Sequence, residues 1–503
     1  MVAVEVEAKL IAPEGIVLPD LSGLLRGSVA QPGAIVALDA RYYDTSDLRL
    51  ARTGTTLRYR SGDGRPGWTL KLPRTRHTSS LSRTEIDFDH PPDRVPDAAV
   101  DLVTALTRGR RLEPVCDMST VRRPIEIRDS NGRLVGVVVD DTVSATSAGR
   151  NVAVLREIEV EVHENSRRAR RLLDAAVSRL AAAGAKPGEP TPKLIRVLGP
   201  LAAKPPDVSV ASLDRNPGLP DVIRHALATS ALSIVRHDPG VRMGGIPEEV
   251  HQLRVGTRRL RSDLRSFAPL LDDTAVAAIR REIGWLGDVV GAVRDLDVLA
   301  ERLSSGIESL GGDDHPAGAV LLGALHGQRS AARDALLGAM RSPRYLEILD
   351  TLVEVSSAPP LRLGLTLSGA DLSRQAKRIV RRSVRDLAAA VERLGDEPGD
   401  SPLHRVRILT KRARYAAEAV TPLAESRLGQ LSVALSQLQG FLGDYNDTVI
   451  AETWLRAAAE RHPDAGVAAG LLIAVERRKR AKLRRRWPVV WRRASKGPLA
   501  DWL

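Results

Sequence analysis

The chain has 503 residues, 43% of them hydrophobic, and its 75 Lys and Arg exceed its 62 Asp and Glu to give a formal charge of +13. This length predicts more than one domain, and the positive charge favours polyanionic partners. Aromatic residues make up only 3% of the chain, which disfavours single-stranded nucleic-acid binding through base stacking. The single cysteine, Cys116, excludes an intramolecular disulfide and a cysteine-based zinc site.

The sequence shows no targeting or membrane signal. It begins MVAVEVEAKL, without a basic segment followed by an apolar one, so we expect no signal peptide. No stretch of about 18 apolar residues occurs, so we expect no transmembrane helix and no membrane partner. These observations predict a cytoplasmic protein.

Residues 1–198 show mainly the two-residue period of β-strands. Alternating segments lie at 4–10, 56–60, 68–71, 83–88, 133–140 and 157–162, with turn-forming residues between several of them. One helix is predicted at 165–183, before Gly184. Residues 199–219 are rich in Pro and small residues, which is typical of a linker.

Residues 220–495 show the period of α-helices instead, and residues 496–503 form a short tail. Gly- and Pro-rich stretches at 238–247, 311–317, 358–364 and 395–402 interrupt long amphipathic runs. We expect about eight to ten helices and almost no strand. The two parts therefore look like domains of different class, α+β followed by all-α.

The predicted strands carry charged residues on one face and apolar residues on the other. Glu5, Glu7 and Lys9 share one face of the first strand, and Glu157, Glu159 and Glu161 share one face of the last. These stripes could simply face water, which is the usual place for charges. Alternatively, they line a closed barrel, in which a metal on the carboxylates and a phosphate chain on the cations would compensate the buried charge.

The order of these charged strands resembles the CYTH superfamily, the triphosphate tunnel metalloenzymes. Glu5-Val-Glu7-Ala-Lys9 resembles its ExExK signature, and the resemblance covers nearly all of residues 1–198. It implies an eight-stranded antiparallel tunnel, covered by helices, that binds triphosphate compounds with Mg²⁺ or Mn²⁺. Glu5, Glu7 and Lys9 are then the expected catalytic residues.

By position, the resemblance implies two sets of residues. The expected metal ligands are Glu5, Glu7, Asp140, Glu157 and Glu159. The expected triphosphate-binding cations are Lys9, Arg58, Arg60, Lys71, Arg83, Arg122 and Lys193. Arg122 is preferred to Arg123, and Asp140 to Asp141, from the alternation of the strands, while Glu161 is either a third acid or a charge at the rim.

The helical part contains an internal repeat with a basic stripe. His251, Arg254, Arg258 and Arg261 recur 153 residues later as His404, Arg407, Lys411 and Arg414. Each set occupies one side of a helix, because its spacing keeps the side chains within about 80° of one another. A stripe could be a solvated surface, but repeated rows of like charge favour an anionic partner.

This half resembles the CHAD domain, the conserved histidine α-helical domain, over about residues 220–495. The resemblance implies two related four-helix bundles around a basic channel that binds inorganic polyphosphate. The expected polyphosphate-binding residues are His251, Arg254, Arg258, Arg261, Arg378, Arg381, His404, Arg407, Lys411 and Arg414. Lys411 replaces an arginine, which keeps the charge but loses the bidentate fork.

Together the two resemblances predict metal-dependent hydrolysis of inorganic triphosphate, or a related short triphosphate, by the first domain and polyphosphate binding by the second. One alternative is a non-catalytic polyphosphate-binding adaptor. Another is thiamine triphosphatase or adenylate-cyclase-like activity in the same tunnel. A cytoplasmic location associated with polyphosphate granules follows from either of the first two functions.

Overall fold

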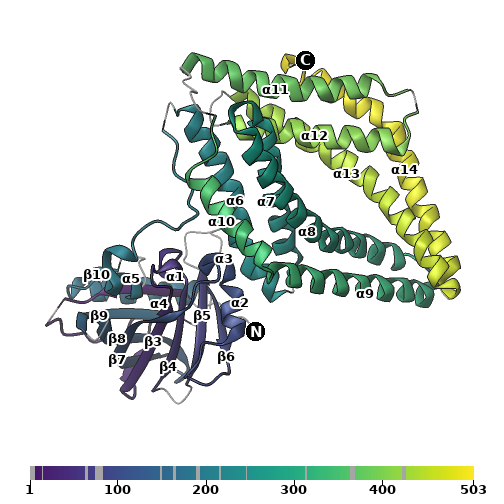
Figure 1. The fold of residues 1–503 in the computed structure, drawn as a ribbon. Coiled ribbons are helices and arrows are strands. Elements are labelled where there is room, and N and C mark those ends of the chain that lie inside the picture. The colour runs from purple at the N-terminus through teal and green to yellow at the C-terminus, as the bar shows by residue number, and fades with distance from the viewer. Residues whose placement is uncertain are drawn as a thin grey trace. The chain divides into compact units, whose positions relative to one another are not determined.

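In a computed structural model, the chain forms two units, Met1–Pro206 and Asp207–Leu503 (Figure 1). The structure describes residues 6–13, 15–62, 66–73, 83–147, 150–162, 166–188, 193–214, 217–244, 246–311, 314–362, 369–395, 397–421 and 426–502. Unit 1 is built on a β-sheet and unit 2 is helical, which confirms the predicted fold classes.

Unit 1 contains one antiparallel sheet in the order β10-β1-β9-β8-β7-β3-β4-β5-β6, with β2 paired to β7. Its strands are β1 (Val6–Ile11), β2 (Val29–Pro32), β3 (Val36–Asp44), β4 (Thr56–Ser61), β5 (Gly67–Pro73), β6 (Arg83–Phe88), β7 (Glu113–Arg128), β8 (Leu134–Ser147), β9 (Arg150–Val162) and β10 (Lys186–Pro187). Eight of these strands have six or more residues, in agreement with the predicted eight, while β2 and β10 are short additions.

Five helices belong to unit 1 among its described residues. They are α1 (Arg49–Arg52), α2 (Asp97–Leu102), α3 (Thr104–Thr107), α4 (Arg167–Ala182) and α5 (Lys193–Leu198). The helix predicted at 165–183 is α4. The Ser166 side chain accepts a hydrogen bond from the amide of Ala169 at its start, and Gly184 follows its end with a φ of 106° that favours glycine.

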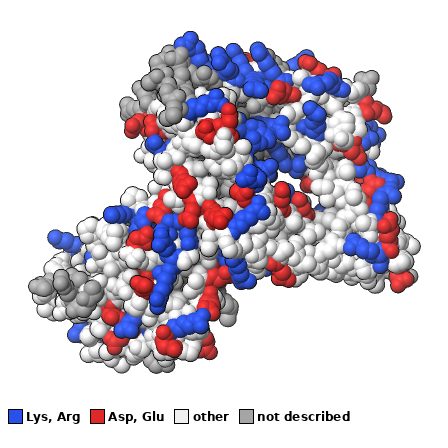
Figure 2. Space-filling model, in the orientation of Figure 1, with Lys and Arg blue, Asp and Glu red and all other residues white. Residues whose placement is uncertain are grey.

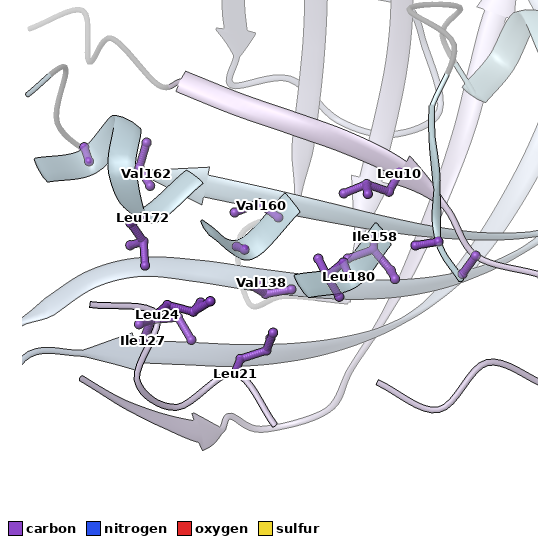
Figure 3. Packing of buried hydrophobic residues seen from close by; sticks show 14 residues of the cluster. Leu10, Leu21, Leu24, Ile127, Val138, Ile158, Val160, Val162, Leu172 and Leu180 are labelled. Carbon is purple, nitrogen blue, oxygen red and sulfur yellow. The ribbon is translucent and has the colours of Figure 1, made fainter. Parts of the chain in front are cut away.

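Helices cover the apolar face of the sheet. Val138 of β8, with Ile158 and Val160 of β9, packs against Leu172 and Leu180 of α4 (Figure 3). A second apolar cluster, around Trp68, lies between β4, β5 and the α2–α3 segment. Because both clusters use the apolar side of the alternating strands, the charged side faces away from these helices.

Unit 2 has nine α-helices among its described residues. They are α6 (Leu219–Met243), α7 (Pro247–Ser266), α8 (Asp273–Ile307), α9 (Asp314–Met340), α10 (Pro343–Ser357), α11 (Gly369–Glu392), α12 (Asp400–Val420), α13 (Ser426–Arg461) and α14 (Gly466–Ser495). The sequence repeat corresponds to α7–α8 in the first bundle and α12–α13 in the second. The bundles are α6–α9 and α11–α14, and α10 packs on α6 as an additional helix.

The first predicted break in this unit, at 238–247, falls between α6 and α7 but is shorter than the stretch that predicted it. Helix α6 continues through Asp238 and Pro239 to Met243, and the chain turns at Gly244, whose φ is 75°. The Asp238 carboxylate is buried, pairs with Arg242 and accepts a hydrogen bond from the Tyr345 hydroxyl of α10. These partners hold the segment helical despite the proline. Within the described residues, no helix is long and apolar enough to cross a membrane.

The core of unit 1 gives a test of this fold. Trp68 is fully buried, lies 4.8 Å from the Tyr43 ring between centroids, and donates a hydrogen bond to the carbonyl of Pro91. We expect Trp68→Ala to lower the free energy of unfolding by about 3–5 kcal/mol in urea denaturation. Val154→Ala, at a side chain that is 70% exposed, should change it by less than about 0.5 kcal/mol. Equal effects of the two variants would contradict this core.

Candidate functional site

The strand register places most of the predicted tunnel residues on one face of the sheet. Directly opposed residues of neighbouring antiparallel strands share a face. Lys9 opposes Glu159, Glu157 opposes Asp141, and Asp141 in turn opposes Arg122. At the other end of the strand order, Arg58 opposes Tyr42 and Thr69, Thr56 opposes Lys71, and Lys71 opposes Glu85.

The sheet curls so that this face encloses its own charges. Burial lowers the pKa of Lys71 on β5, and the charges of Arg58 and of Lys9 lower it further. Lys9 is on β1, and five strands separate β1 from β5 in the sheet. The two ammonium groups can interact only because the face is concave. The predicted interpretation of a charged interior, rather than a solvated exterior, therefore fits the described residues.

Three carboxylates in this concave face converge on one lysine. The Lys193 Nζ atom lies 2.9 Å from Asp141 Oδ2, 2.9 Å from Glu157 Oε2 and 3.3 Å from Glu159 Oε1. Asp141 is only 1% exposed and Glu157 only 2%. Burial lowers the pKa of Lys193 to about 8, although Asp141 opposes that shift. Burial also raises the pKa of Asp141, but hydrogen bonds and charges from Arg122 and Lys193 lower it by more. The pKa of Asp141 therefore lies below the ordinary value.

Further cations complete the set. Arg122 donates two hydrogen bonds of 2.9 Å to the Asp141 carboxylate, and Lys9 Nζ lies 2.9 Å from Glu159 Oε1. Arg196 donates to Glu157 Oε1 at 3.0 Å. Lys193 and Arg196 are one turn apart on α5, whose Leu194 and Val197 pack on the same face of the sheet, near Met118 and Val143. The acids of this face are therefore neutralised by cations of the chain itself. We call this set the tunnel cluster, which comprises Lys9, Arg122, Asp141, Glu157, Glu159, Lys193 and Arg196.

Asp141, not Asp140, belongs to the tunnel cluster. Asp140 opposes Ile158 in the register, and its carboxylate makes two hydrogen bonds to Arg156, which also donates to the carbonyl of Ile16. This is the helix-covered face of the sheet. The preference for Asp140 is therefore corrected. Arg122, in contrast, lies in the cluster as expected, whereas Arg123 donates to Thr142 on the opposite face.

The structure describes the remaining predicted tunnel residues unevenly. Glu5 lies outside the described residues, as do the side chains of Glu7 and Arg83. The Lys71 ammonium pairs with Glu85, and Arg58 donates to the Tyr42 hydroxyl at 3.3 Å. Arg60 opposes Ala40 and Gly67, which places it on the same face as Arg58. Glu161 lies opposite Glu7 in the register, toward the far end of β9 from Glu157.

The donors of the tunnel cluster fit a hard divalent cation. Carboxylate oxygens are the ligands that Mg²⁺ and Mn²⁺ prefer, and three of these groups already surround one positive charge, the Lys193 ammonium. Among the described residues, however, no three His, Cys, Asp or Glu side chains are grouped so as to hold a metal ion. Among the described residues, a metal could be bound by the carboxylates of Asp141, Glu157 and Glu159, which would then release their present cation partners.

Unit 2 places the basic stripes of the two repeats against each other. On α7, Arg254 donates to the Gly291 carbonyl of α8 at 2.9 Å and to Asp295 Oδ1 at 2.7 Å. On α12, burial lowers the pKa of Arg407, and Arg258 and Arg254 of α7 add to that shift, while Asp447 of α13 opposes it. The two equivalent helices thus bring their cations to one place.

Lys411 lies at the centre of this basic cluster, which we define as Arg254, Arg258, Arg407 and Lys411. Burial lowers the pKa of Lys411 to about 7, and the charges of the three arginines lower it further, while Asp295 opposes the shift. The Nε atoms of Arg258 and Arg407 are buried and have no hydrogen-bond partner. Figure 2 shows Lys and Arg side chains gathered in a hollow of this unit, in the area of α7, α12 and α13. The cluster thus has an excess of cations and donors without partners.

The two histidines differ in their surroundings. His404 Nδ1 lies 2.6 Å from Asn446 Oδ1 of α13. Burial lowers the pKa of His251, and Arg294 of α8 adds to that shift. Arg294 is the equivalent of Asn446, since both lie 43 or 42 residues after the histidine. Both histidines therefore flank the basic cluster, but only His404 has a neutral hydrogen-bond partner.

Two other basic segments do not belong to the cluster. Arg378 and Arg381 lie exposed on α11, whereas the cluster is on α7 and α12, and their role in polyphosphate binding stays a prediction. In the basic run of residues 477–486, Arg477 and Arg480 pair with Glu452 of α13, and Arg484 pairs with Asp400 of α12. That run therefore holds α14 to the bundle in part.

Comparisons with known proteins agree with both resemblances. A family model of the CYTH domain matches residues 3–179, and a model of the CHAD domain matches residues 225–456. The uncharacterized protein Rv2226 of Mycobacterium tuberculosis is 30% identical over 467 residues, which cover 90% of this chain and 88% of that protein.

Solved structures similar to this chain include two that cover its helical part. A crystal structure of the CHAD domain from the plant Ricinus communis is 31% identical, covers 55% of this chain and 91% of that one, and has a TM-score of 0.46. The structure of PptA from Streptomyces chartreusis is 26% identical, covers 54% of this chain and 98% of that one, and also has a TM-score of 0.46.

The basic cluster predicts an unusual effect on stability. The charged form of Lys411 is disfavoured in the folded chain, whose Lys411 pKa is about 7 against 10.5 for an ordinary lysine. Since the unfolded chain binds more protons, Lys411 opposes folding most strongly below pH 7, and this effect fades as the pH approaches 10.5. We expect Lys411→Met to raise the free energy of unfolding by at least about 1 kcal/mol at pH 6, and by less at pH 9.

The exposed Lys377 of α11 provides a matched control, because Lys377→Met should change stability by less than about 0.5 kcal/mol at either pH. Chemical denaturation of both variants at the two pH values checks this expectation. A loss of stability in Lys411→Met at pH 6 would show that the ammonium is not surrounded by uncompensated charge.

Proposed function

The chain belongs to the CYTH–CHAD proteins, and from this premise we propose that residues 1–198 hydrolyse a short triphosphate while residues 220–495 bind inorganic polyphosphate. Residues 199–219 then act as the linker and residues 496–503 as a tail. Membership of the CYTH family implies a triphosphate tunnel, and the CHAD domain is associated with polyphosphate. The finer assignments below are supported by the charges and contacts of the two units.

For unit 1 we propose inorganic triphosphate, or a related short triphosphate, as the substrate. The cations of the concave face would hold the phosphate oxygens, and the expected set is Lys9, Arg58, Arg60, Lys71, Arg83, Arg122, Lys193 and, newly, Arg196. Glu157, Glu159 and Asp141, with Glu5 and Glu7, would hold Mg²⁺ or Mn²⁺. When bound, such an ion polarises the terminal phosphoryl group and can lower the pKa of an attacking water.

Exchange of ion pairs is the step that the chain's own residues perform. In this structure, Lys193 and Arg122 pair with the Asp141 carboxylate. If Asp141, Glu157 and Glu159 held a metal, Lys193 and Arg122 would be free to bind the phosphate chain, where they would position it and neutralise its charge during hydrolysis. Nothing in this arrangement calls for a covalent intermediate, since burial raises the pKa of the Cys116 thiol to about 12 and keeps it un-ionised.

For unit 2, one observation carries the proposal of polyphosphate binding. Arg258 and Arg407 bury Nε donors that have no partner, beside a lysine whose pKa is depressed to about 7. Buried donors are normally satisfied, and a row of like charge is stable only with an anion beside it. A flexible polyanion such as polyphosphate would supply acceptors to both repeats at once. A cytoplasmic location, with association with polyphosphate granules, follows from this proposal.

The alternatives differ in what the tunnel does. A polyphosphate-binding adaptor would bind triphosphate without turnover, and the paired acids and cations of the tunnel cluster would then be structural. A thiamine triphosphatase or an adenylate cyclase would use the same phosphate-binding cations on a larger substrate. The buried, converging carboxylates Asp141, Glu157 and Glu159 favour a metal-dependent reaction over the adaptor.

Two neighbouring aspartates provide a matched test of the tunnel. We expect phosphate release from tripolyphosphate that requires Mg²⁺ or Mn²⁺ and stops with chelator. Asp141→Asn should reduce kcat by 100-fold or more (about 3 kcal/mol in barrier), because one metal-side carboxylate and the partner of Arg122 are lost. Asp140→Asn should retain activity within about 10-fold, because its carboxylate pairs with Arg156 on the opposite face.

Circular dichroism and thermal melts show whether each variant is folded. Glu7→Gln and Glu157→Gln should behave like Asp141→Asn. If the wild-type protein binds tripolyphosphate but never releases phosphate with either metal, the adaptor replaces the triphosphatase. If Asp140→Asn is the more damaging of the two aspartate variants, the tunnel face is assigned incorrectly.

The basic cluster has its own test. We expect Arg254→Glu combined with Arg407→Glu to weaken polyphosphate binding strongly and to flatten its dependence on salt, because fewer counterions are released, by analogy with nucleic acids. Arg378→Glu combined with Arg381→Glu tests the two expected residues that lie outside the cluster, on exposed α11, and a smaller effect of this pair would separate the cluster from general surface charge. Titrations at several salt concentrations measure the slope, and an unchanged slope in the first variant would contradict the assignment. Displacement of polyphosphate by duplex DNA at equal charge would contradict specificity for phosphate chains.

A further inference from the structure

The duplicated helices differ at one end of the basic row. Helices α7 and α12 align with an offset of 153 residues, and α8 and α13 with an offset of 152. Contacts support this alignment, since Arg414 of α12 lies 3.4 Å from Ser436 and 3.5 Å from Gln439, while Arg261 of α7 lies over the equivalent Gly284 and Gly287. Equivalent residues of the two repeats can therefore be compared in pairs.

In the first repeat, this comparison identifies an arginine quartet, Arg261, Arg265, Arg280 and Arg412. Partial burial lowers the pKa of Arg265 to about 10, and the charges of Arg412, Arg280 and Arg261 contribute. Within the described residues, no carboxylate lies at ion-pair distance from any member. The Arg280 Nε atom is buried and without a hydrogen-bond partner. Three helices thus bring four positive charges together without compensation.

In the second repeat, the equivalent place is neutralised. The equivalents of Arg261 and Arg412 are Arg414 and Arg259, but the equivalent of Arg265 is Glu418, and that of Arg280 is Ser432. The Glu418 carboxylate lies 2.7 Å from Arg414 Nε and 3.8 Å from Arg259 Nη2. The formal charge is therefore +4 at the quartet and +1 at its counterpart. The two repeats therefore carry unlike charge at this end of the basic row.

The quartet suits a phosphate group of higher charge than the others. Arg265 lies eleven residues beyond Arg254 on α7, which is about 16 Å along the helix, so the quartet extends the row rather than repeating it. Along a linear phosphate chain, an internal phosphate carries one negative charge, whereas the terminal group can carry two. The second ionisation of a terminal phosphoryl group occurs near pH 6, as it does in phosphorylated side chains. Guanidinium groups bind such oxygens in bidentate pairs.

We propose that the arginine quartet is an end site, which holds the terminal phosphate of a linear polyphosphate chain whose internal phosphates lie along the basic cluster. The proposal rests on polyphosphate binding by unit 2. It gives the row a direction, with the chain end at Arg265 and Arg280 and the continuing chain toward Arg254 and Arg407. The counterpart around Glu418, at the equivalent end of α12, would not hold a chain end, because an acid there disfavours a doubly charged group.

The test compares two ligands with the same number of phosphates, linear hexaphosphate and cyclic hexametaphosphate, which has no chain end. Binding is measured by calorimetry at pH 7.5 without metal. We expect the wild-type protein to prefer the linear ligand by about 10-fold, the size of a charge-assisted contact. The double variant Arg265→Glu with Arg280→Ser gives the first repeat the residues of the second. It should reduce the preference for the linear ligand to about 2-fold. This residual preference would reflect the different total charges of the two ligands.

Controls separate the end site from general electrostatics. Arg254→Ala with Arg407→Ala should weaken both ligands and keep their ratio. Linear hexaphosphate with esterified ends should bind the wild-type protein like the cyclic ligand. Arg412→Ser is a milder variant, which tests the quartet even if the double variant does not fold.

The outcomes are distinct. A fall of the ratio in the quartet variants alone supports the end site. An unchanged ratio in the folded quartet variants overturns it, while polyphosphate binding itself still stands. If the wild-type protein binds neither ligand at low salt, the proposed function of unit 2 fails, and the end site fails with it.

Discussion

A charge removed from water needs an opposite charge or a hydrogen-bond partner beside it, and the two units of this protein meet that requirement differently. In the concave face of unit 1, acids and cations from β1, β7, β8, β9 and α5 satisfy one another. In unit 2, the facing helices α7 and α12 bring arginines and a lysine together, and the buried Nε donors of Arg258 and Arg407 have no partner. The ion pairs of the first arrangement form within the unit, although the buried Nε atom of Arg58 has no hydrogen-bond partner, whereas the second arrangement has an excess of cations.

This difference indicates how each unit would respond to phosphate. In the tunnel, a metal and a phosphate chain would each replace one half of an existing ion pair, so the two ligands would favour each other's binding. Along α7 and α12, a bound anion would neutralise cations that now repel one another. Binding would therefore remove an unfavourable electrostatic free energy of the folded chain. The same elementary constraint thus supports a metal-dependent site in one unit and a metal-independent one in the other.

Much of this was predictable from the sequence. The two-residue period identified the charged faces at Lys9, Arg58, Lys71 and Glu157, and the repeat identified the two basic stripes. The choice between Asp140 and Asp141 was wrong because adjacent acids occupy opposite faces, and only the register with Arg122 and Glu157 decides between them. Arg196 was missed because its role depends on α5 lying across the concave face, a long-range contact. Strands β3 and β7 were not recognised as separate elements, and two prolines interrupt the pattern of β7.

The most direct measurement is hydrogen exchange of the full chain, with and without long-chain polyphosphate and in the absence of metal. We expect slower exchange in peptides from α7 and α12, where the uncompensated cations meet, and little change in the strands of unit 1, where the acids of the tunnel cluster are already paired with cations. Protection confined to unit 1, or an unaltered exchange of α7 and α12 in protein that has bound polyphosphate, would contradict it.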